Sequence, residues 1–448
     1  MDSLRSQMRF DRNIILKNMA LLMIFTALSI PLFPNLAYAT IYVGFFLVIG
    51  ILYFSFSIQW ISTLTIFYAL AFISLGPGIY FIVLEHTVMQ YNPYIIVLPG
   101  MGMILAGYIF GSIRFFKKGK IIRFHGTVSW KISLYGTYML STVAWMIYYF
   151  RFRGLLNVNL ENGRIEAMSG SGALVYIAQL HIMTIVLMFI ESKKKYISKL
   201  VFWPLCIFGL IQLLSMGFRS PAAICVICIL IVQILDGKIR LRTTIPIVCV
   251  IFSLAIFYGV YRSGTSGLKL YYVLREQLYN PMYNLDVMYR YFPSHVGFQH
   301  GYTYLINLIM LLPGPGQDFT LWLKDAIGFT FFGGGITPTV FGEFYINFGT
   351  AGIFICSFLL GIWFRKLDNW IYSGNVDFWR AYTLILVPSC LGGGIANIMI
   401  QPLIFGIYYL FLSIISYPHH ATISTNVNRE FHSKGEKNTW AIKVEKSV

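Results

Sequence analysis

The sequence contains few charged residues, and acidic residues are especially scarce. Asp, Glu, Lys and Arg make up 11% of the 448 residues, and only 17 residues are Asp or Glu. Soluble domains usually carry roughly a quarter of charged residues. Hydrophobic residues account for 57% of the chain, and the mean hydropathy is +0.69. We therefore expect lipid to be the main solvent and no independent soluble domain.

Several motifs of soluble enzymes are also absent. The chain has no Walker phosphate loop, no H-E-x-x-H zinc-protease motif and no D-x-D of metal-dependent nucleotide-sugar enzymes. All six cysteines lie within apolar runs, which argues against a disulfide framework or a metal site. Cys225 and Cys228 form a C-x-x-C pair, but no basic or polar neighbours favour thiolates there. We expect no metal, no cofactor and no nucleotide chemistry on the inner face.

Long apolar runs recur from residue 18 to residue 416. Each is long enough for a helix that crosses the hydrocarbon core, where backbone groups must be paired internally. The predicted spans are 18–36, 37–56, 60–84, 93–113, 132–150, 171–190, 200–216, 220–235, 243–261, 336–364, 380–395 and 399–416. The last two are separated because Pro388 and Gly392 to Gly394 interrupt a continuous apolar stretch. The sequence predicts an all-α integral membrane protein, residues 1–448 forming one polytopic domain of about 12 (11 to 13) transmembrane helices.

The positions of the basic residues predict the orientation. With both termini inside, the inner segments hold 25 of the 34 Lys and Arg residues, as the positive-inside rule requires. The formal charge of +17 is therefore interpreted as a topology signal, and no nucleic-acid partner is expected. This arrangement predicts a large external loop at 262–335 and an inner tail at 417–448. The first span imitates a cleavable signal peptide ending at Ala37-Tyr38-Ala39, but the even span count requires it to be retained.

The external basic residues are mostly arginines. Seven of the nine are Arg, whereas the inner segments carry 10 Arg and 15 Lys. A guanidinium offers a planar fork suited to phosphate or carboxylate. We expect a diphosphate clamp at the interface made by Arg219, Arg262, Arg275 and Arg290. Ser220-Pro221 also favours a helix start, whose free N–H groups would add to an anion site. The alternative interpretation is snorkelling, or ion pairing with Glu161, Glu166, Glu276 and Asp286.

The external loop is rich in tyrosine and contains apolar stretches at 304–312 and 319–332. This composition favours short amphipathic helices lying on the membrane, with the tyrosines as interface anchors first and sugar-stacking surfaces second. Beyond the loop, Glu343 and Asn347 lie four residues apart on one face of an apolar span. A carboxylate inside the membrane indicates a functional site, although a structural pair with an arginine explains it equally well.

Three stretches carry a resemblance to a known family. They are Gly217-Phe218-Arg219-Ser220-Pro221, Tyr261-Arg262-Ser263-Gly264, and Thr337-Pro338 followed by Gly342-Glu343-Phe344-Tyr345-Ile346-Asn347-Phe348-Gly349-Thr350-Ala351-Gly352. With them, the chain resembles the bacterial O-antigen polymerase, or oligosaccharide repeat-unit polymerase, family of the Wzy type. The last stretch is the most specific, and the general layout of the chain also agrees.

The resemblance implies a GT-C-like polymerase/ligase architecture and a metal-independent membrane glycosyltransferase. Such an enzyme works in the bacterial cell inner membrane, on its periplasmic face. It transfers the growing chain from undecaprenyl diphosphate to a hydroxyl of an incoming lipid-linked repeat unit. Partners would be the undecaprenyl-diphosphate-linked oligosaccharides, membrane lipid, a flippase and a chain-length regulator (polysaccharide co-polymerase). Glu343 and His300 are the expected catalytic groups, with Asn347 joining the four arginines in substrate binding.

Two rival functions remain open. A lipopolysaccharide O-antigen ligase would share the fold, the arginines and the donor, and would differ in its acceptor. A lipid-linked oligosaccharide flippase belongs to a different class and is favoured by the twelve spans. Such a transporter predicts two related halves, whereas the sequence shows no internal repeat.

Overall fold

The computed structural model describes residues 62–68, 70–71, 74–75, 93–111, 128–158, 171–216, 219–235, 268–312, 318–330, 335–372 and 377–433. Within these ranges the regular elements are all helices. The predicted spans 18–36, 37–56 and 243–261, and Arg262, lie outside the described residues. So does most of the predicted span 60–84.

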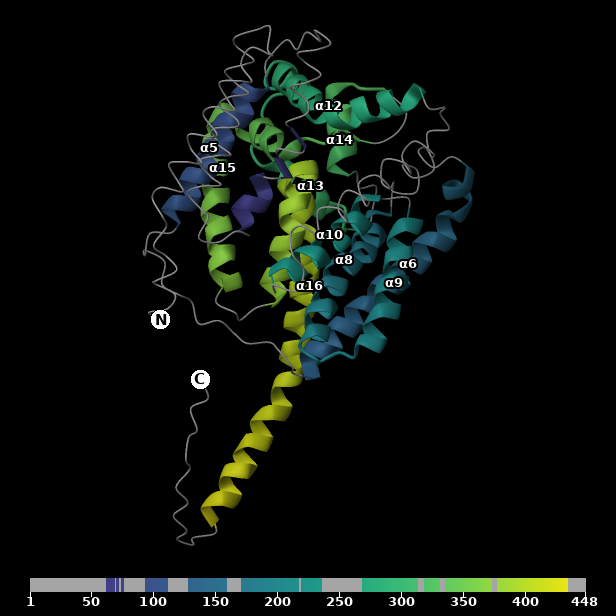
Figure 1. The fold of residues 1–448 in the computed structure, drawn as a ribbon, viewed down its shortest axis with the longest axis vertical. Coiled ribbons are helices and arrows are strands. Elements are labelled where there is room, and N and C mark those ends of the chain that lie inside the picture. Colours follow the sequence, from purple (N-terminus) through teal and green to yellow (C-terminus); the bar gives the residue numbers. More distant parts are fainter. Residues whose placement is uncertain are drawn as a thin grey trace.

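Ten helices are labelled in Figure 1. They are α5 (Tyr94–Phe110), α6 (Val128–Val158), α8 (Gly172–Lys193), α9 (Lys199–Ser215), α10 (Arg219–Leu235), α12 (Leu268–Tyr291), α13 (Tyr302–Ile309), α14 (Phe319–Ile327), α15 (Thr339–Tyr372) and α16 (Asp377–Ser433). Helices α5, α8, α9 and α10 match the predicted apolar runs to within a few residues, while α6 and α15 extend further. The described part of the chain is therefore all-helical, as the sequence predicted.

Among the described residues, two helices are long and apolar enough to cross a membrane, Gly172–Lys193 and Thr339–Asn369. A third candidate is the bent pair Phe378–Ala396 and Ile398–Phe411, if the two halves form one span. Three shorter apolar helices accompany them, namely Ile96–Phe110, Lys199–Ser215 and Ser220–Ile234. These features are compatible with a helical membrane protein. The count of twelve spans and the GT-C-like architecture stay predictions.

Helix α8 is the centre of one half of the bundle. Helices α6, α9, α10 and α16 pack around it, and nearly all of its residues are buried. A helix that is apolar on every side is stable only when other helices or lipid surround it. The Trp130 Nε1–H donates to Glu191 Oε1 at 3.1 Å, which ties the start of α6 to the end of α8. The two helices are therefore antiparallel.

Helices α5 and α15 form the other half of the bundle through an unusually close contact. A Cβ atom at Gly107 would overlap the carbonyl oxygen of Phe358, and one at Gly361 would overlap that of Ile104. Small residues allow two helix backbones to approach in membranes, where packing rather than the hydrophobic effect drives association. Helix α16 lies between this pair and the α8 group (Figure 1).

Asp368 joins α15 to the start of an earlier helical segment. Its carboxylate accepts hydrogen bonds from the Thr63 N–H at 2.8 Å, the Thr63 hydroxyl and the Tyr108 hydroxyl at 2.6 Å. The Arg365 guanidinium lies over the Tyr108 ring, 5.2 Å from its centroid. Asp368 is only 1% exposed, so these donors replace the water that its charge would otherwise require.

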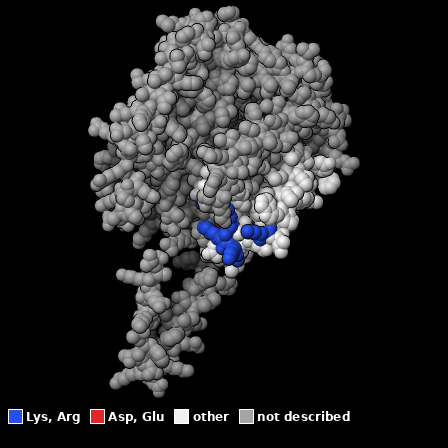
Figure 2. Space-filling model, viewed as in Figure 1, with Lys and Arg blue, Asp and Glu red and all other residues white. Residues whose placement is uncertain are grey.

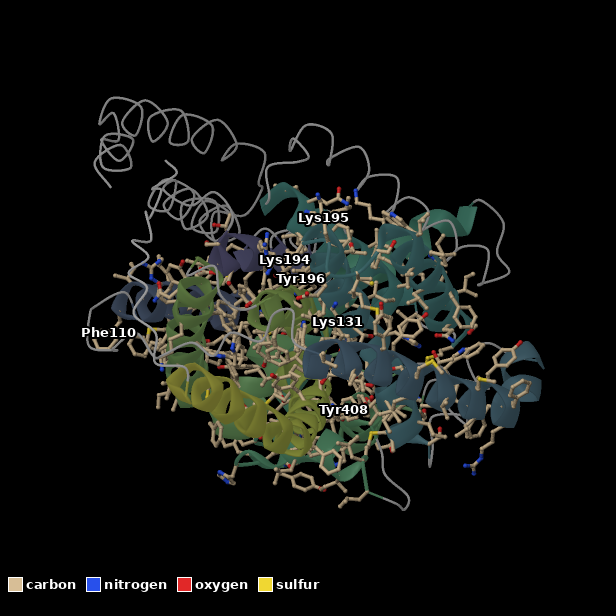
Figure 3. The ribbon with its side chains drawn as sticks, turned by 90° about the horizontal axis from the view of Figure 1, so that it is seen from below. Phe110, Lys131, Lys194, Lys195, Tyr196 and Tyr408 are labelled. Atoms are coloured by element: carbon tan, nitrogen blue, oxygen red, sulfur yellow. The ribbon has the colours of Figure 1, made fainter. Side chains whose placement is uncertain are left out.

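The predicted external loop folds into α12, α13 and α14, and α12 and α14 lie at one end of the bundle (Figure 1). At the other end lies the basic patch in Figure 2, and Figure 3 shows Lys131, Lys194 and Lys195 on that end, viewed from below. Helices α12 and α14 and these lysines therefore lie at opposite ends of the bundle, and the orientation in the membrane stays a prediction.

Helix α16 is broken as the glycine run predicted. Gly394 has non-helical angles (φ 74°, ψ −173°), and the two halves meet at 104°. Helix α15 has a similar break at Gly349 (φ 63°, ψ −152°). The helix of α16 continues to Ser433, beyond the predicted start of the inner tail at 417, and residues 434–448 lie outside the described residues.

Candidate functional site

A fully buried carboxylate, that of Glu343, lies near the two helix breaks. Glu343 lies on the first part of α15, six residues before the break at Gly349, and is 0% exposed. The break at Gly394 in α16 faces it, because a Cβ atom at that position would overlap Glu343 Oε2. Gly394 also has a positive φ, which other residues rarely adopt. Two independent constraints therefore require glycine beside Glu343.

The Glu343 carboxylate caps the second half of α16. It accepts a hydrogen bond from the Ile395 N–H, and the Ala396 N–H lies 3.2 Å from Oε1 and 3.4 Å from Oε2. The first N–H groups of a helix have no partner within it and carry a partial positive charge. A carboxylate at this position satisfies those donors, so Glu343 fixes where α16 restarts after its break.

Asn347 joins the predicted external loop to the same part of α15. Its Nδ2 donates to Thr303 Oγ1 at 2.6 Å and to the Glu343 carbonyl at 2.9 Å, and its Oδ1 accepts from the Gly301 N–H at 2.8 Å. The Thr303 hydroxyl lies 3.4 Å from Glu343 Oε1. Both Asn347 and Thr303 are 0% exposed. Because Glu343 and Asn347 lie four residues apart on one face of α15, they belong to one connected polar site.

The loop backbone is held at the break in α15. The N–H of His300 donates to the Asn347 carbonyl at 3.0 Å, and that of Gln299 donates to the Ile346 carbonyl at 3.0 Å. His300 has a positive φ of 49° and its side chain is exposed. We call residues 299–303 the latch segment, because its hydrogen bonds fix the loop on α15. The latch segment therefore holds the His300 backbone on α15 and leaves the His300 side chain exposed.

Tyr304 follows the latch segment and is half-buried. Burial raises the pKa of its hydroxyl well above the ordinary value, and the negative charge of Glu343 raises it further. The hydroxyl also interacts with Asn347 and Cys356. It therefore remains protonated and serves as a hydrogen-bond donor at the edge of the site.

Helix α12 packs on the segment that carries Glu343. The rings of Tyr289 and Tyr345 stack with centroids 4.7 Å apart, and the Tyr345 hydroxyl donates to the Phe292 carbonyl at 3.0 Å. On the same helix, Arg290 Nη2 lies 3.1 Å from Asp286 Oδ2. The Arg290 side chain is 30% exposed and that of Asp286 only 2%. Arg290 therefore forms an ion pair with Asp286. Ion pairing with acidic residues was part of the alternative interpretation of the arginines predicted to be external.

The other predicted anion-binding residues are described only in part. Arg219 begins α10 and Arg275 lies within α12, but neither side chain is described, and Arg262 lies outside the described residues. The four-arginine clamp therefore stays a prediction. Among the described residues, no group of three or more His, Cys, Asp or Glu could hold a metal ion.

Sequence reasoning identified Glu343, Asn347 and His300 but missed the groups that join them. The backbone N–H groups of Ile395 and Ala396 have no side-chain signature, and Thr303 lies 40 residues from Glu343 in the chain. The glycines at 392–394 predicted a helix break. This break was the sequence feature that could have indicated a helix start, and so a cap, at Ile395 and Ala396. Nothing in the sequence indicated that it would face Glu343.

Comparison with protein-family models, with curated proteins and with solved structures gave no match. The family resemblance of the three sequence stretches therefore stays a prediction, and the function is argued from the site.

Proposed function

We propose that this chain is a metal-independent membrane glycosyltransferase that polymerises lipid-linked oligosaccharide repeat units. The reaction would take place on the periplasmic face of a bacterial inner membrane. One observation carries the proposal: the stretch with the strongest family resemblance, Gly342 to Gly352, is the stretch that holds Glu343 and Asn347 and binds the latch segment of the external loop.

The reaction requires one bond exchange at a sugar carbon. The bond from the reducing-end carbon of the growing chain to undecaprenyl diphosphate breaks, and its electron pair leaves with the diphosphate. A hydroxyl oxygen of the lipid-linked repeat unit forms the new glycosidic bond and releases its proton to a base. Preorganised guanidinium groups stabilise the charge that develops on the diphosphate. Arg219, Arg262, Arg275 and Arg290 are proposed for this task.

The environments of Glu343 and His300 support different roles. His300 has an exposed imidazole on a backbone fixed by Asn347, which suits a group that orients the acceptor hydroxyl and takes its proton. Glu343 is 0% exposed, and its carboxylate already accepts hydrogen bonds from two helix N–H groups and faces Thr303. We assign His300 as the proton acceptor and Glu343 as a positioning residue.

The proposal includes the partners of such an enzyme. A flippase would supply the lipid-linked repeat units, and a chain-length regulator would set the extent of polymerisation. An O-antigen ligase would use the same donor and the same leaving-group chemistry, with lipid A core as its acceptor. The site does not distinguish the two acceptors, so the experiment below is designed to do so.

A flippase is the second candidate, and one observation favours it. Two discontinuous helices, α15 and α16, meet at a buried carboxylate within candidate membrane spans. Transporters often bind substrate and coupling ions at such helix breaks. The hydrogen bonds of Glu343 to the α16 backbone favour a structural role over ion coupling, which is why the polymerase is preferred.

A gel of surface polysaccharide tests these alternatives. Cells that lack the gene are complemented with the native chain, His300→Ala or Glu343→Ala. A polymerase predicts lipid core carrying one repeat unit in the deletion strain, and a ladder restored by the native chain. Bare core with long lipid-linked polymer outside would indicate a ligase. Repeat units trapped inside would indicate a flippase.

A further inference from the structure

A second polar cluster lies within the bundle, away from Glu343. His181 on α8 and Gln212 on α9 are both 0% exposed. Both ring nitrogens of His181 and both side-chain atoms of the Gln212 amide lack a hydrogen-bond partner within the described part of the chain. Four such atoms in two buried side chains are unusual, because native proteins pair nearly all of their buried polar groups.

Contacts between α8 and α9 bring the two side chains to the same level. A Cβ atom at Gly209 would lie 2.7 Å from Ile185 Cδ1, so these residues face each other. The helices are antiparallel, since the rings of Phe189 and Phe202 also pair, at 5.5 Å. Moving one turn from each contact leads to His181 and Gln212, a rise of about 6 Å along α8 and about 4.5 Å along α9 in the same direction.

Helix α6 packs against both α8 and α9 at this level of the bundle. The Tyr138 ring lies 4.7 Å from that of His181, and its hydroxyl donates to the Leu205 carbonyl at 2.7 Å. Tyr138 therefore contacts both α8 and α9. One turn further along α6, the buried hydroxyl of Ser141 donates to the Thr137 carbonyl at 2.9 Å, which leaves its oxygen able to accept. Three packed helices thus contribute polar side chains to one layer.

A buried amide on α16, that of Gln401, has one protein partner on α8, while its Oε1 has no partner among the described residues. Gln401 Nε2 on α16 donates to Gln179 Oε1 on α8 at 3.2 Å. His181 lies only two residues beyond Gln179 on α8 and lacks such a partner among the described residues. The described residues also hold no cluster of three metal ligands. A ligand that both donates and accepts hydrogen bonds, and carries no charge, fits this chemistry.

We propose that His181 and Gln212 form an internal water-binding site between α6, α8 and α9. Water molecules bound there donate to the unprotonated imidazole nitrogen and to the Gln212 oxygen, and accept from the imidazole N–H and from the Gln212 amide, with a separate molecule at each ring nitrogen. Buried water molecules typically make about three hydrogen bonds of this kind to otherwise unpaired groups. The site is independent of the proposed enzymatic function.

Radiolytic hydroxyl labelling of the purified full chain in lipid nanodiscs, followed by mass spectrometry, tests the proposal. Radicals form at bound water, so Tyr138, which is only 3% exposed, is labelled if water lies beside His181. Phe202 is the matched aromatic control, because it is 1% exposed and packs against Phe189. We expect Tyr138 to be labelled several-fold faster than Phe202. Equal, slow labelling of both residues would overturn the proposal.

Variants refine the same measurement. The double variant His181→Phe with Gln212→Leu removes all four polar atoms and is expected to reduce Tyr138 labelling to the Phe202 level. Gln401→Leu is the control, because it removes a buried amide whose Nε2 donates to Gln179 on α8, and it should leave Tyr138 labelling unchanged. Persistent Tyr138 labelling in a double variant that elutes as folded protein would show that the water does not depend on His181 and Gln212.

Discussion

Glu343 on α15 holds the broken end of α16 through the N–H of Ala396, which lies 3.2 Å from its Oε1. The Ile395 N–H donates to the same carboxylate, and Gly394 supplies the positive φ that turns these groups toward it. The carboxyl oxygens in this position accept hydrogen bonds from orphan helix donors, which lipid could not do. Thr303, in the predicted external loop, hydrogen-bonds Asn347 and lies next to Glu343, so the predicted external loop, α15 and α16 meet in one site.

The glycine at this contact should be indispensable. Gly394→Ala forces a side chain into a left-handed backbone conformation, which costs about 1–3 kcal/mol, and places its Cβ against Glu343. We expect a clear loss of thermal stability, measured by scanning fluorimetry of the purified protein in detergent. Gly392→Ala is the matched control, because a Cβ there has open space, and alanine in a helix gains about 0.5–1 kcal/mol. Equal effects of the two variants would contradict the cap.

The latch segment should depend on the hydroxyl of Thr303. Thr303→Val keeps the shape but leaves Asn347 Nδ2 without its 2.6 Å acceptor, a penalty of about 1–3 kcal/mol. Thr303→Ser keeps the hydroxyl and should be close to the native protein. Hydrogen exchange of residues 299–303 provides the measurement, with faster exchange expected in the valine variant alone. As a control, Thr142→Val removes a hydroxyl that bonds only within α6. Unchanged exchange in Thr303→Val would rule out the latch.

An added side-chain atom at the close contact between α5 and α15 should destabilise the protein. Gly107→Ala places a Cβ into the carbonyl of Phe358, and overpacking of this kind costs about 1–3 kcal/mol. Gly102→Ala lies on the same helix with nothing within 4 Å of its Cβ, and should be neutral or stabilising. The midpoint of thermal unfolding in detergent separates them. A Gly107→Ala protein as stable as Gly102→Ala would mean that the two helices do not approach so closely.

The arginine clamp is tested by replacing the forked guanidinium group with a lysine ammonium group, which keeps the positive charge. Single Arg→Lys substitutions at Arg219, Arg262, Arg275 and Arg290 should reduce polymer formation if a bidentate diphosphate site is present. Arg290 is expected to be the least sensitive, because Asp286 already pairs with it. Arg380→Lys is the control, because it applies the same change at the start of the predicted span 380–395, on the predicted inner side. Full activity of all four variants would exclude the clamp and leave ion pairing or snorkelling.

The sequence predicted the helices well because apolar length is a local property. The runs at 171–190 and 200–216 correspond closely to α8 and α9, and the break at Gly392 to Gly394 was visible as a loss of helix-forming residues. Partners across the fold were not predictable in the same way. The cap on Ile395 and Ala396 uses backbone donors, and the placement of His181 and Gln212 at one level of the bundle follows from the register of α8 against α9. Such relationships depend on three-dimensional packing that no short motif encodes.

Reconstitution tests the central claim most directly. The purified chain is placed in proteoliposomes with short undecaprenyl-diphosphate-linked repeat units, and the products are separated by gel electrophoresis after mild release. The account predicts a ladder of lengths differing by one repeat unit, formed without added metal, together with release of undecaprenyl diphosphate. The ladder should be lost with His300→Ala, although that protein should remain folded. Repeat units that stay single, or that cross the bilayer without joining, would contradict the polymerase.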